Sequence, residues 1–138
     1  SLITIPIAFS NVTIRAMLDT GATSSLITMD LINKLRLSDQ VSSQTGEIVL
    51  GDSSTKIRQQ GVIELKFNIR HLECGIRAKV VDQLTFEVIL GLDFINRYHV
   101  DIFTKRKFIL MGDTENRTRV YFTKPALVRA NHQCTVLP

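Results

Sequence analysis

Apolar residues recur at every second position near the start of the chain, and this period predicts β-strands. The first segment carries them at Ile3, Ile5, Ile7 and Phe9. After a polar turn at residues 10–11, a second segment repeats the pattern with Val12, Ile14, Ala16 and Leu18. Together the two segments predict a β-hairpin whose second strand runs directly into Asp19.

The longest alternation lies between residues 63 and 80. One set of positions is apolar and comprises Ile63, Leu65, Phe67, Ile69, Cys74, Ile76, Ala78 and Val80. Most intervening positions are polar, among them Glu64, Lys66, Asn68, Arg70, Arg77 and Lys79. Strands with one dry face and one wet face are typical of antiparallel sheets, so we expect two more antiparallel strands here.

Helical patterns are scarce in this sequence. Thr28 is placed to cap a short helix with apolar residues at Leu31, Ile32 and Leu35. A second short helix is expected over residues 93–98, with Asp93 in its first turn, where the helix dipole favours an acid in a capping role. Strands are expected over residues 99–103 and 107–111. The whole predicts an all-β fold, a small barrel with one or two short helices.

The composition changes past Gly112, where the chain becomes polar and rich in turn residues. We therefore expect one folded domain over residues 1–112 and a basic C-terminal extension or linker over residues 113–138. Lys and Arg number 10 against 11 Asp and Glu in residues 1–103, but 7 against 2 in residues 104–138. This basic tail lacks a helical pattern, zinc-ligand spacing and interleaved aromatics, so the sequence favours a linker over a nucleic-acid partner.

The overall composition fits a single folded domain, with 44% hydrophobic and 22% charged residues among 138. No apolar run reaches the roughly 18 residues of a membrane-spanning helix, so no membrane partner is expected. The chain begins inside an expected strand without a secretion-type leader, which favours a piece of a longer polypeptide over a secreted protein. Cys74 and Cys134 stand alone, which indicates idle thiols in a reducing compartment rather than a disulfide or a metal site.

The candidate chemistry lies at Asp19-Thr20-Gly21. Such a triplet can be an ordinary turn, because Asp and Gly are frequent turn residues. Here an apolar strand enters the triplet and Leu26 and Ile27 follow it. The carboxylate is therefore expected at the end of a buried strand, where pKa values shift and catalysis is common. Gly21 would permit a sharp turn and a close ligand, and the Thr20 hydroxyl can both donate and accept hydrogen bonds.

Two further segments complete a pattern. Residues 48–57 predict a hairpin with a small, polar tip, and residues 88–91 form an apolar run that ends in Gly91. Together with the Asp-Thr-Gly triplet, they resemble the retropepsin-like aspartic proteases over about residues 3–112. The sequence looks most similar to proteases of long-terminal-repeat retrotransposons of the Ty3/gypsy type, and to the related domain of the DNA-damage-inducible ubiquitin shuttle proteins.

The resemblance implies a retropepsin-like closed barrel with a mobile flap at residues 50–57. It also implies a homodimer, because the chain holds a single Asp-Thr-Gly triplet. Asp19 of each copy would form a catalytic dyad that shares one proton and activates a water, without a metal or a cofactor. Thr20 would bond across the dimer axis as part of the active-site turn. Substrate contacts are implied for Gly21, Ala22, Thr23, Leu50, Gly51, Asp52, Ser53 and Ile89.

The function implied by the resemblance is that of an aspartic endopeptidase cleaving extended peptide segments of a polyprotein, in the cytoplasm or within virus-like particles. Thr23 and Ser24 stand where viral relatives often carry acidic residues, which implies a different subsite polarity. One alternative is a domesticated, catalytically silent retropepsin fold that serves as a dimerisation or peptide-binding module. Another is a nucleic-acid-binding fragment that uses the basic tail. The sequence has no serine-hydrolase elbow, phosphate loop or dinucleotide fingerprint.

Overall fold

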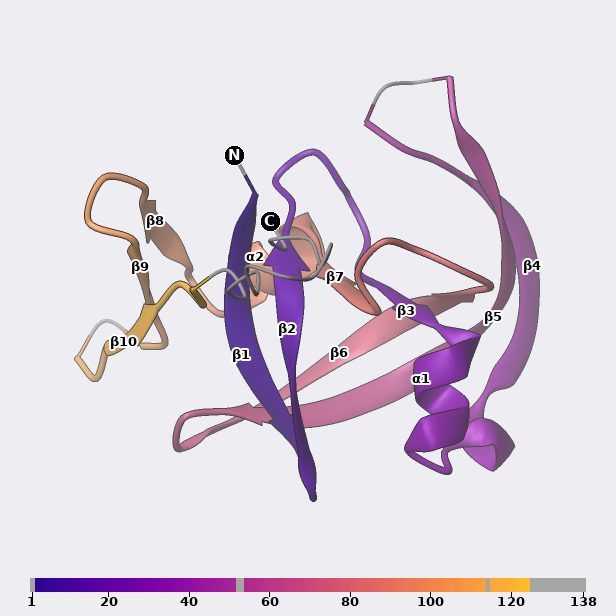
Figure 1. The fold of residues 1–138 in the computed structure, drawn as a ribbon, viewed down its shortest axis with the longest axis horizontal. Coiled ribbons are helices and arrows are strands. Elements are labelled where there is room, and N and C mark those ends of the chain that lie inside the picture. The colour runs from indigo at the N-terminus through magenta and orange to yellow at the C-terminus, as the bar shows by residue number, and fades with distance from the viewer. Residues whose placement is uncertain (1, 52–53, 114, 125–138) are drawn as a thin grey trace, which may run out of the picture.

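The computed structural model describes residues 2–51, 54–113 and 115–124, and these residues form mostly β-strands (Figure 1). The strands are β1 (Ile3–Phe9), β2 (Val12–Leu18), β3 (Leu26–Thr28), β4 (Ser42–Val49), β5 (Lys56–Ile69), β6 (Leu72–Val81), β7 (Val88–Leu90), β8 (Asp101–Phe103), β9 (Phe108–Met111) and β10 (Thr118–Tyr121). Within the same ranges lie two short helices and a 3-10 turn, namely α1 (Met29–Lys34), α2 (Leu92–Arg97) and η1 (Ser38–Gln40).

Six strands close into a barrel, in the order β1, β2, β7, β3, β6 and β5. The ring closes where β5 returns to β1, with Asn68 opposite Ala8. β4 extends the sheet beyond β5, and the β4–β5 hairpin rises beside the barrel at the right of Figure 1. The expected all-β fold, a closed barrel with short helices, is therefore confirmed.

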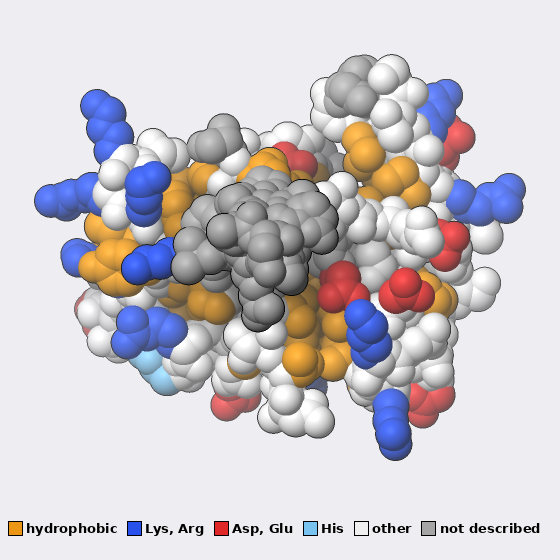
Figure 2. All heavy atoms as spheres, viewed as in Figure 1, with side chains coloured by type: hydrophobic (Ala, Val, Ile, Leu, Met, Phe, Trp, Pro, Cys, Tyr) orange, Lys and Arg blue, Asp and Glu red, His pale blue; other side chains and the backbone are white. Residues whose placement is uncertain are grey.

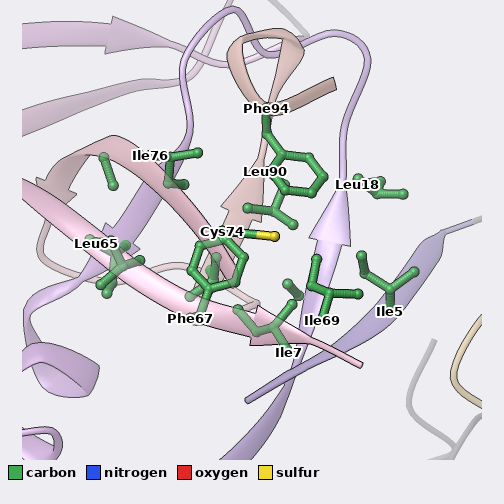
Figure 3. Close-up of a cluster of buried hydrophobic side chains, with 14 of the residues drawn as sticks. Ile5, Ile7, Leu18, Leu65, Phe67, Ile69, Cys74, Ile76, Leu90 and Phe94 are labelled. Atoms are coloured by element: carbon green, nitrogen blue, oxygen red, sulfur yellow. The ribbon is translucent and has the colours of Figure 1, made fainter. Parts of the chain in front are cut away.

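The barrel encloses an apolar core built from the alternating positions of its strands (Figure 3). In β5 and β6, buried apolar residues alternate with more exposed neighbours over most of their length. Phe94 of α2 is fully buried in this core, with its ring centroid 6.2 Å from that of Phe67. Burial raises the pKa of the Cys74 thiol to about 11. Because the thiolate is the reactive form, Cys74 acts as a packing residue rather than a nucleophile.

Two pairings in the barrel are parallel, which the alternation of the sequence did not indicate. β2 runs parallel to β7, and β3 runs parallel to β6. β3 and β7 are three residues long and buried at every position. Strands buried on both faces read as continuous apolar runs, so they lack the two-residue period that marks a half-exposed strand.

A three-stranded sheet of β8, β9 and β10 lies beside the barrel, at the left of Figure 1. β10 pairs with β9, and beyond β10 the Thr123 amide donates to the Thr4 carbonyl oxygen of β1 (2.8 Å). The boundary expected at residue 112 therefore falls between two paired strands. The Arg119 guanidinium lies 4.3 Å from the ring centroid of Phe108, so part of the basic segment is packed into this sheet. Residues 125–138 of the expected extension lie outside the described residues.

Both expected helices are present, and the first has the predicted cap. The Thr28 hydroxyl accepts a hydrogen bond from the Leu31 amide (3.3 Å) at the start of α1. Leu31 and Ile32 are buried, as the apolar spacing predicted. α2 begins directly after Gly91, which occupies its N-cap position.

Gly91 lies against the loop of residues 19–25 that joins β2 to β3. A Cβ atom on Gly91 would come within 2.5 Å of the Ala22 carbonyl oxygen and 3.0 Å of the Ser24 carbonyl oxygen. The same Ala22 oxygen accepts a hydrogen bond from the Leu92 amide (2.8 Å). A residue without a side chain is therefore needed for the loop to approach the start of α2 so closely.

We expect Gly91→Ala to destabilise the fold, because the added methyl group meets backbone atoms rather than a movable side chain. Overpacking of this kind costs about 1–3 kcal/mol, which urea unfolding followed by circular dichroism would measure. Gly75→Ala is the matched control, since a Cβ atom there would lie at an ordinary 3.8 Å from the Leu65 carbonyl oxygen. Equal unfolding midpoints for the two variants would contradict the close approach at Gly91.

Candidate active site

Asp19 is held by a tight turn at the end of β2. Its amide donates to the Leu90 carbonyl oxygen (2.9 Å) and so prolongs the pairing of β2 with β7. Its carboxylate oxygen Oδ1 accepts a hydrogen bond from the Gly21 amide (2.9 Å), and its carbonyl oxygen accepts one from the Ala22 amide (3.1 Å). Asp19 is half-buried, whereas Thr20 and Gly21 are exposed. The carboxylate is thus fixed in position and still open to water and to a ligand.

A second carboxylate, that of Asp93, holds the other end of the loop. It accepts hydrogen bonds from the Ser25 amide (2.9 Å), the Ser25 hydroxyl (2.6 Å) and the Phe94 amide (2.8 Å). The Ser25 hydroxyl oxygen in turn accepts a hydrogen bond from the Gly91 amide (3.1 Å). Asp93 therefore fastens the loop to the first turn of α2, where the sequence placed it, and its carboxylate is engaged in structural contacts.

A cavity of about 230 Å³ lies between this loop and the β4–β5 hairpin. Its lining comprises Asp19, Gly21, Ala22, Thr23 and Ser24 from the loop, Leu26 and Lys79 from the sheet, and Glu47, Ile48, Val49, Leu50 and Gly51 from the hairpin. Hydrophobic side chains gather below the tip of the hairpin (Figure 2). Val49, one of the lining residues, is 54% exposed. The cavity therefore offers apolar contacts beside a fixed carboxylate, as a site for a peptide would.

The structure brings most of the predicted site residues to this cavity. They are Asp19, Gly21, Ala22, Thr23, Leu50 and Gly51. Thr20 is exposed and is not part of the lining. Ile89 lies buried in β7, directly opposite Leu26, which does line the cavity. Asp52 and Ser53 lie outside the described residues.

Polar residues of the site that the sequence did not mark as site residues include Ser25, Glu47 and Lys79. Ser25 is fully buried, and the available signal was a small polar residue directly before a buried strand. Glu47 and Lys79 line the cavity. The alternation of β6 places Lys79 on the polar face of its strand, and the sequence alone did not show that this face borders the cavity.

The chemistry open to one fixed carboxylate is limited. It can take a proton from water, but peptide hydrolysis also needs a group that protonates the carbonyl oxygen or the leaving amine. The other acid of the lining, Glu47, is exposed and paired with Lys56 (3.6 Å). In the described part of the chain, no group of three or more His, Cys, Asp or Glu residues could hold a metal ion. The arrangement therefore fits one half of a carboxylate pair, or a binding cleft.

No helix in the described ranges is both long enough and apolar enough to cross a membrane.

Comparisons with known proteins identify the family and the fold of this chain. The sequence pattern of one family, described as gag-polyprotein putative aspartyl protease, matches residues 5–97. No curated protein matches the chain. Among solved structures, the retroviral protease-like domain of Ddi1 from Leishmania major aligns with 89% of this chain and 94% of its own, with a TM-score of 0.73 and 19% identity.

Two further solved structures share the fold with lower TM-scores. A retropepsin-like aspartic protease from Rickettsia conorii aligns with 75% of this chain and 85% of its own, with a TM-score of 0.54 and 23% identity. EIAV protease, in complex with the inhibitor HBY-793, aligns with 70% of this chain and 88% of its own, with a TM-score of 0.51 and 18% identity. At these identities the structures establish the fold, and the family pattern spans the loop, the hairpin and α2. The chain belongs to the gag-polyprotein putative aspartyl protease family and has the retropepsin-like fold.

Proposed function

We propose that this protein is an aspartic endopeptidase of the retropepsin type that cleaves extended peptide segments of a polyprotein. The observation that carries the proposal is the Asp19 carboxylate, fixed by the Gly21 amide (2.9 Å) in the wall of a cavity beside a β-hairpin. The family pattern over residues 5–97 supports it. A Ty3/gypsy-type retrotransposon or a domesticated relative is the source we expect, with the enzyme in the cytoplasm or within virus-like particles.

The second acid of the proposed site is Asp19 of another copy of the chain. Acid–base cleavage by carboxylates needs two of them, and this sequence holds one Asp-Thr-Gly triplet. A two-fold axis beside Thr20 would bring the two Asp19 side chains together and build one site from both loops. The exposure of Thr20 and Gly21 leaves this part of the loop accessible to a second copy.

The proposed reaction follows from placing two carboxylates side by side. They cannot both ionise at close range, so the pair shares one proton. The ionised carboxylate takes a proton from a water held between them, and the water oxygen attacks the peptide carbonyl carbon. The protonated carboxylate donates its proton to the carbonyl oxygen. Collapse of the tetrahedral intermediate, with proton transfer to the amide nitrogen, breaks the C–N bond and releases two peptides.

An extended peptide is the ligand that suits the cavity. The backbone of Gly21 on the loop and of Gly51 on the hairpin could pair with such a peptide as a strand pairs with its neighbours. Ala22, Thr23, Leu50 and the buried Ile89 would contact its side chains. Asp52 and Ser53 follow Gly51 in the sequence and would belong to a flap that closes over the peptide and excludes bulk water.

A catalytically silent peptide-binding or dimerisation module is the competing function. The hydrogen bonds that Asp93 makes to Ser25 and Phe94 fix the loop without any reaction at Asp19. The same fold could therefore persist in a domesticated relative that had lost its activity. Replacement of the Asp19 carboxylate separates the two functions.

Asp19→Asn should abolish peptide cleavage without unfolding the protein. The Asn side-chain oxygen can still accept the Gly21 hydrogen bond, but it cannot take a proton from water. Loss of this acid–base step lowers kcat by about 10²–10⁴-fold, which a fluorogenic peptide library at mildly acidic pH would measure. Asp39→Asn, which changes an exposed carboxylate of η1, is the matched control and should keep the parental rate. An Asp19→Asn protein that folds and cleaves as fast as the parent would refute the catalytic assignment.

Subunit mixing tests whether two copies share the site. If each site needs two Asp19 side chains, Asp19→Asn chains co-refolded with parental chains will form inactive mixed dimers. With random pairing, a threefold excess of the variant leaves about a quarter of the activity of the parental chains. The same excess of Asp39→Asn chains should raise the total activity instead. Parental activity that is unaffected by Asp19→Asn chains, under conditions where gel filtration shows mixed dimers, would rule out a shared site.

A further inference from the structure

One row of side chains crosses the outer face of the barrel sheet. Its members lie directly opposite one another on neighbouring strands, in the order Met17, Ile89, Leu26, Lys79 and Val62. Opposite residues on paired strands point to the same face of a sheet. Ile89, Leu26 and Val62 are between 2% and 6% exposed, although they lie outside the core cluster of the barrel. The row is therefore a second apolar layer, and of its five members Lys79 alone is charged.

Lys79 brings a positive charge into the wall of the cavity that Asp19 also lines. The residue is half-buried between Leu26 of β3 and Val62 of β5. A lysine in such a place packs its methylene stem on apolar neighbours and directs its amine toward the open space. The side chains of Thr23 and Ser24, which come from the loop, are uncharged, and Asp19 is the carboxylate that the loop contributes to the lining.

Apart from the Asp19 carboxylate, which forms no salt bridge among the described residues, the other charges near the cavity are paired. Arg77 lies two residues before Lys79 on the same face of β6 and forms a salt bridge with Glu64 (3.0 Å). Glu47, on the hairpin, is paired with Lys56 (3.6 Å). Across the residues that the structure describes, no carboxylate pairs with Lys79. Since Lys79 is half-buried and has no carboxylate partner among the described residues, its amine would gain free energy from a carboxylate that a ligand supplies.

We propose that Lys79 selects substrates that carry an acidic side chain, Asp or Glu, close to the bond that is cleaved. The inference rests on the proposed function, because it names the substrate class of the same cavity. β2, which leads into Asp19, and β6 are three strands apart in the sheet. This separation is about 14 Å at the usual strand spacing, and an extended peptide advances by about 3.3 Å per residue. The selected side chain therefore lies within about four residues of the cleaved bond.

Substrate peptides that differ only by Glu, Gln or Lys at one position test the selection. At one position near the cleaved bond, Glu should raise kcat/KM about tenfold over Gln, the change that about 1.4 kcal/mol produces. Lys79→Glu should reverse the preference at that position toward Lys. Lys79→Met keeps the apolar stem and should abolish the preference. Lys66→Glu makes the same charge change on the exposed face of β5 and is the matched control, which should keep the preference for Glu.

Binding of the same peptides to Asp19→Asn protein, measured by fluorescence anisotropy, separates this inference from the proposed activity. In one outcome the Glu peptide binds more tightly than the Gln peptide, Lys79→Glu reverses this preference, and the parental protein cleaves neither peptide. That outcome would refute the proposed protease activity and support the charge selection by Lys79. If the protein cleaves and binds the peptides with no preference for Glu over Gln at any position, the charge selection by Lys79 is refuted and the proposed protease activity is not. A preference that survives Lys79→Glu, or the absence of any peptide binding, would also overturn the charge selection.

Discussion

The backbone contact between the Asp-Thr-Gly loop and residues 90–92 is the constraint on which the site depends. The Leu90 carbonyl oxygen accepts a hydrogen bond from the Asp19 amide. The Gly91 amide donates one to the Ser25 hydroxyl oxygen, and the Leu92 amide donates one to the Ala22 carbonyl oxygen. Three successive residues thus hold three different points of the loop. Loops that carry functional groups are usually the mobile part of a fold. Here hydrogen bonds to the end of β7 and to the start of α2 fix the loop in place.

The same contact couples the loop to the interior of the barrel. Asp93 binds Ser25 of the loop, and Phe94, the next residue, is fully buried in the core. The first turn of α2 therefore places one side chain, Asp93, against the loop and the next, Phe94, in the core of the barrel. A change in the packing around Phe94 would be transmitted to the loop through a single peptide unit. The first turn of this short helix, directly after the buried strand β7, therefore anchors the loop.

The sequence predicted those parts of the fold whose residues carry their own signal. β5 and β6 were predicted because each has one buried and one exposed face, and α1 was predicted because Thr28 is a capping residue. The first part of β4 was missed because residues 42–47 are exposed at every position and so show no period. The parallel partners of β3 and β7 were not predictable, since a continuous apolar run does not specify which strand pairs with it.

The same distinction, between residues that carry their own sequence signal and residues that do not, applies to the candidate site. The Asp19 turn was predicted from its own residues and their apolar flanks, whereas the parts contributed by distant strands were not. A polar position on a half-exposed strand indicates solvent only where nothing else approaches that face. Closure of the barrel brings Lys79 of β6 opposite Leu26, and the loop and the hairpin complete a cavity around them. The two-residue period of β6 therefore predicted correctly that Lys79 lies on the polar face of its strand. In the tertiary fold this face forms part of the wall of the cavity.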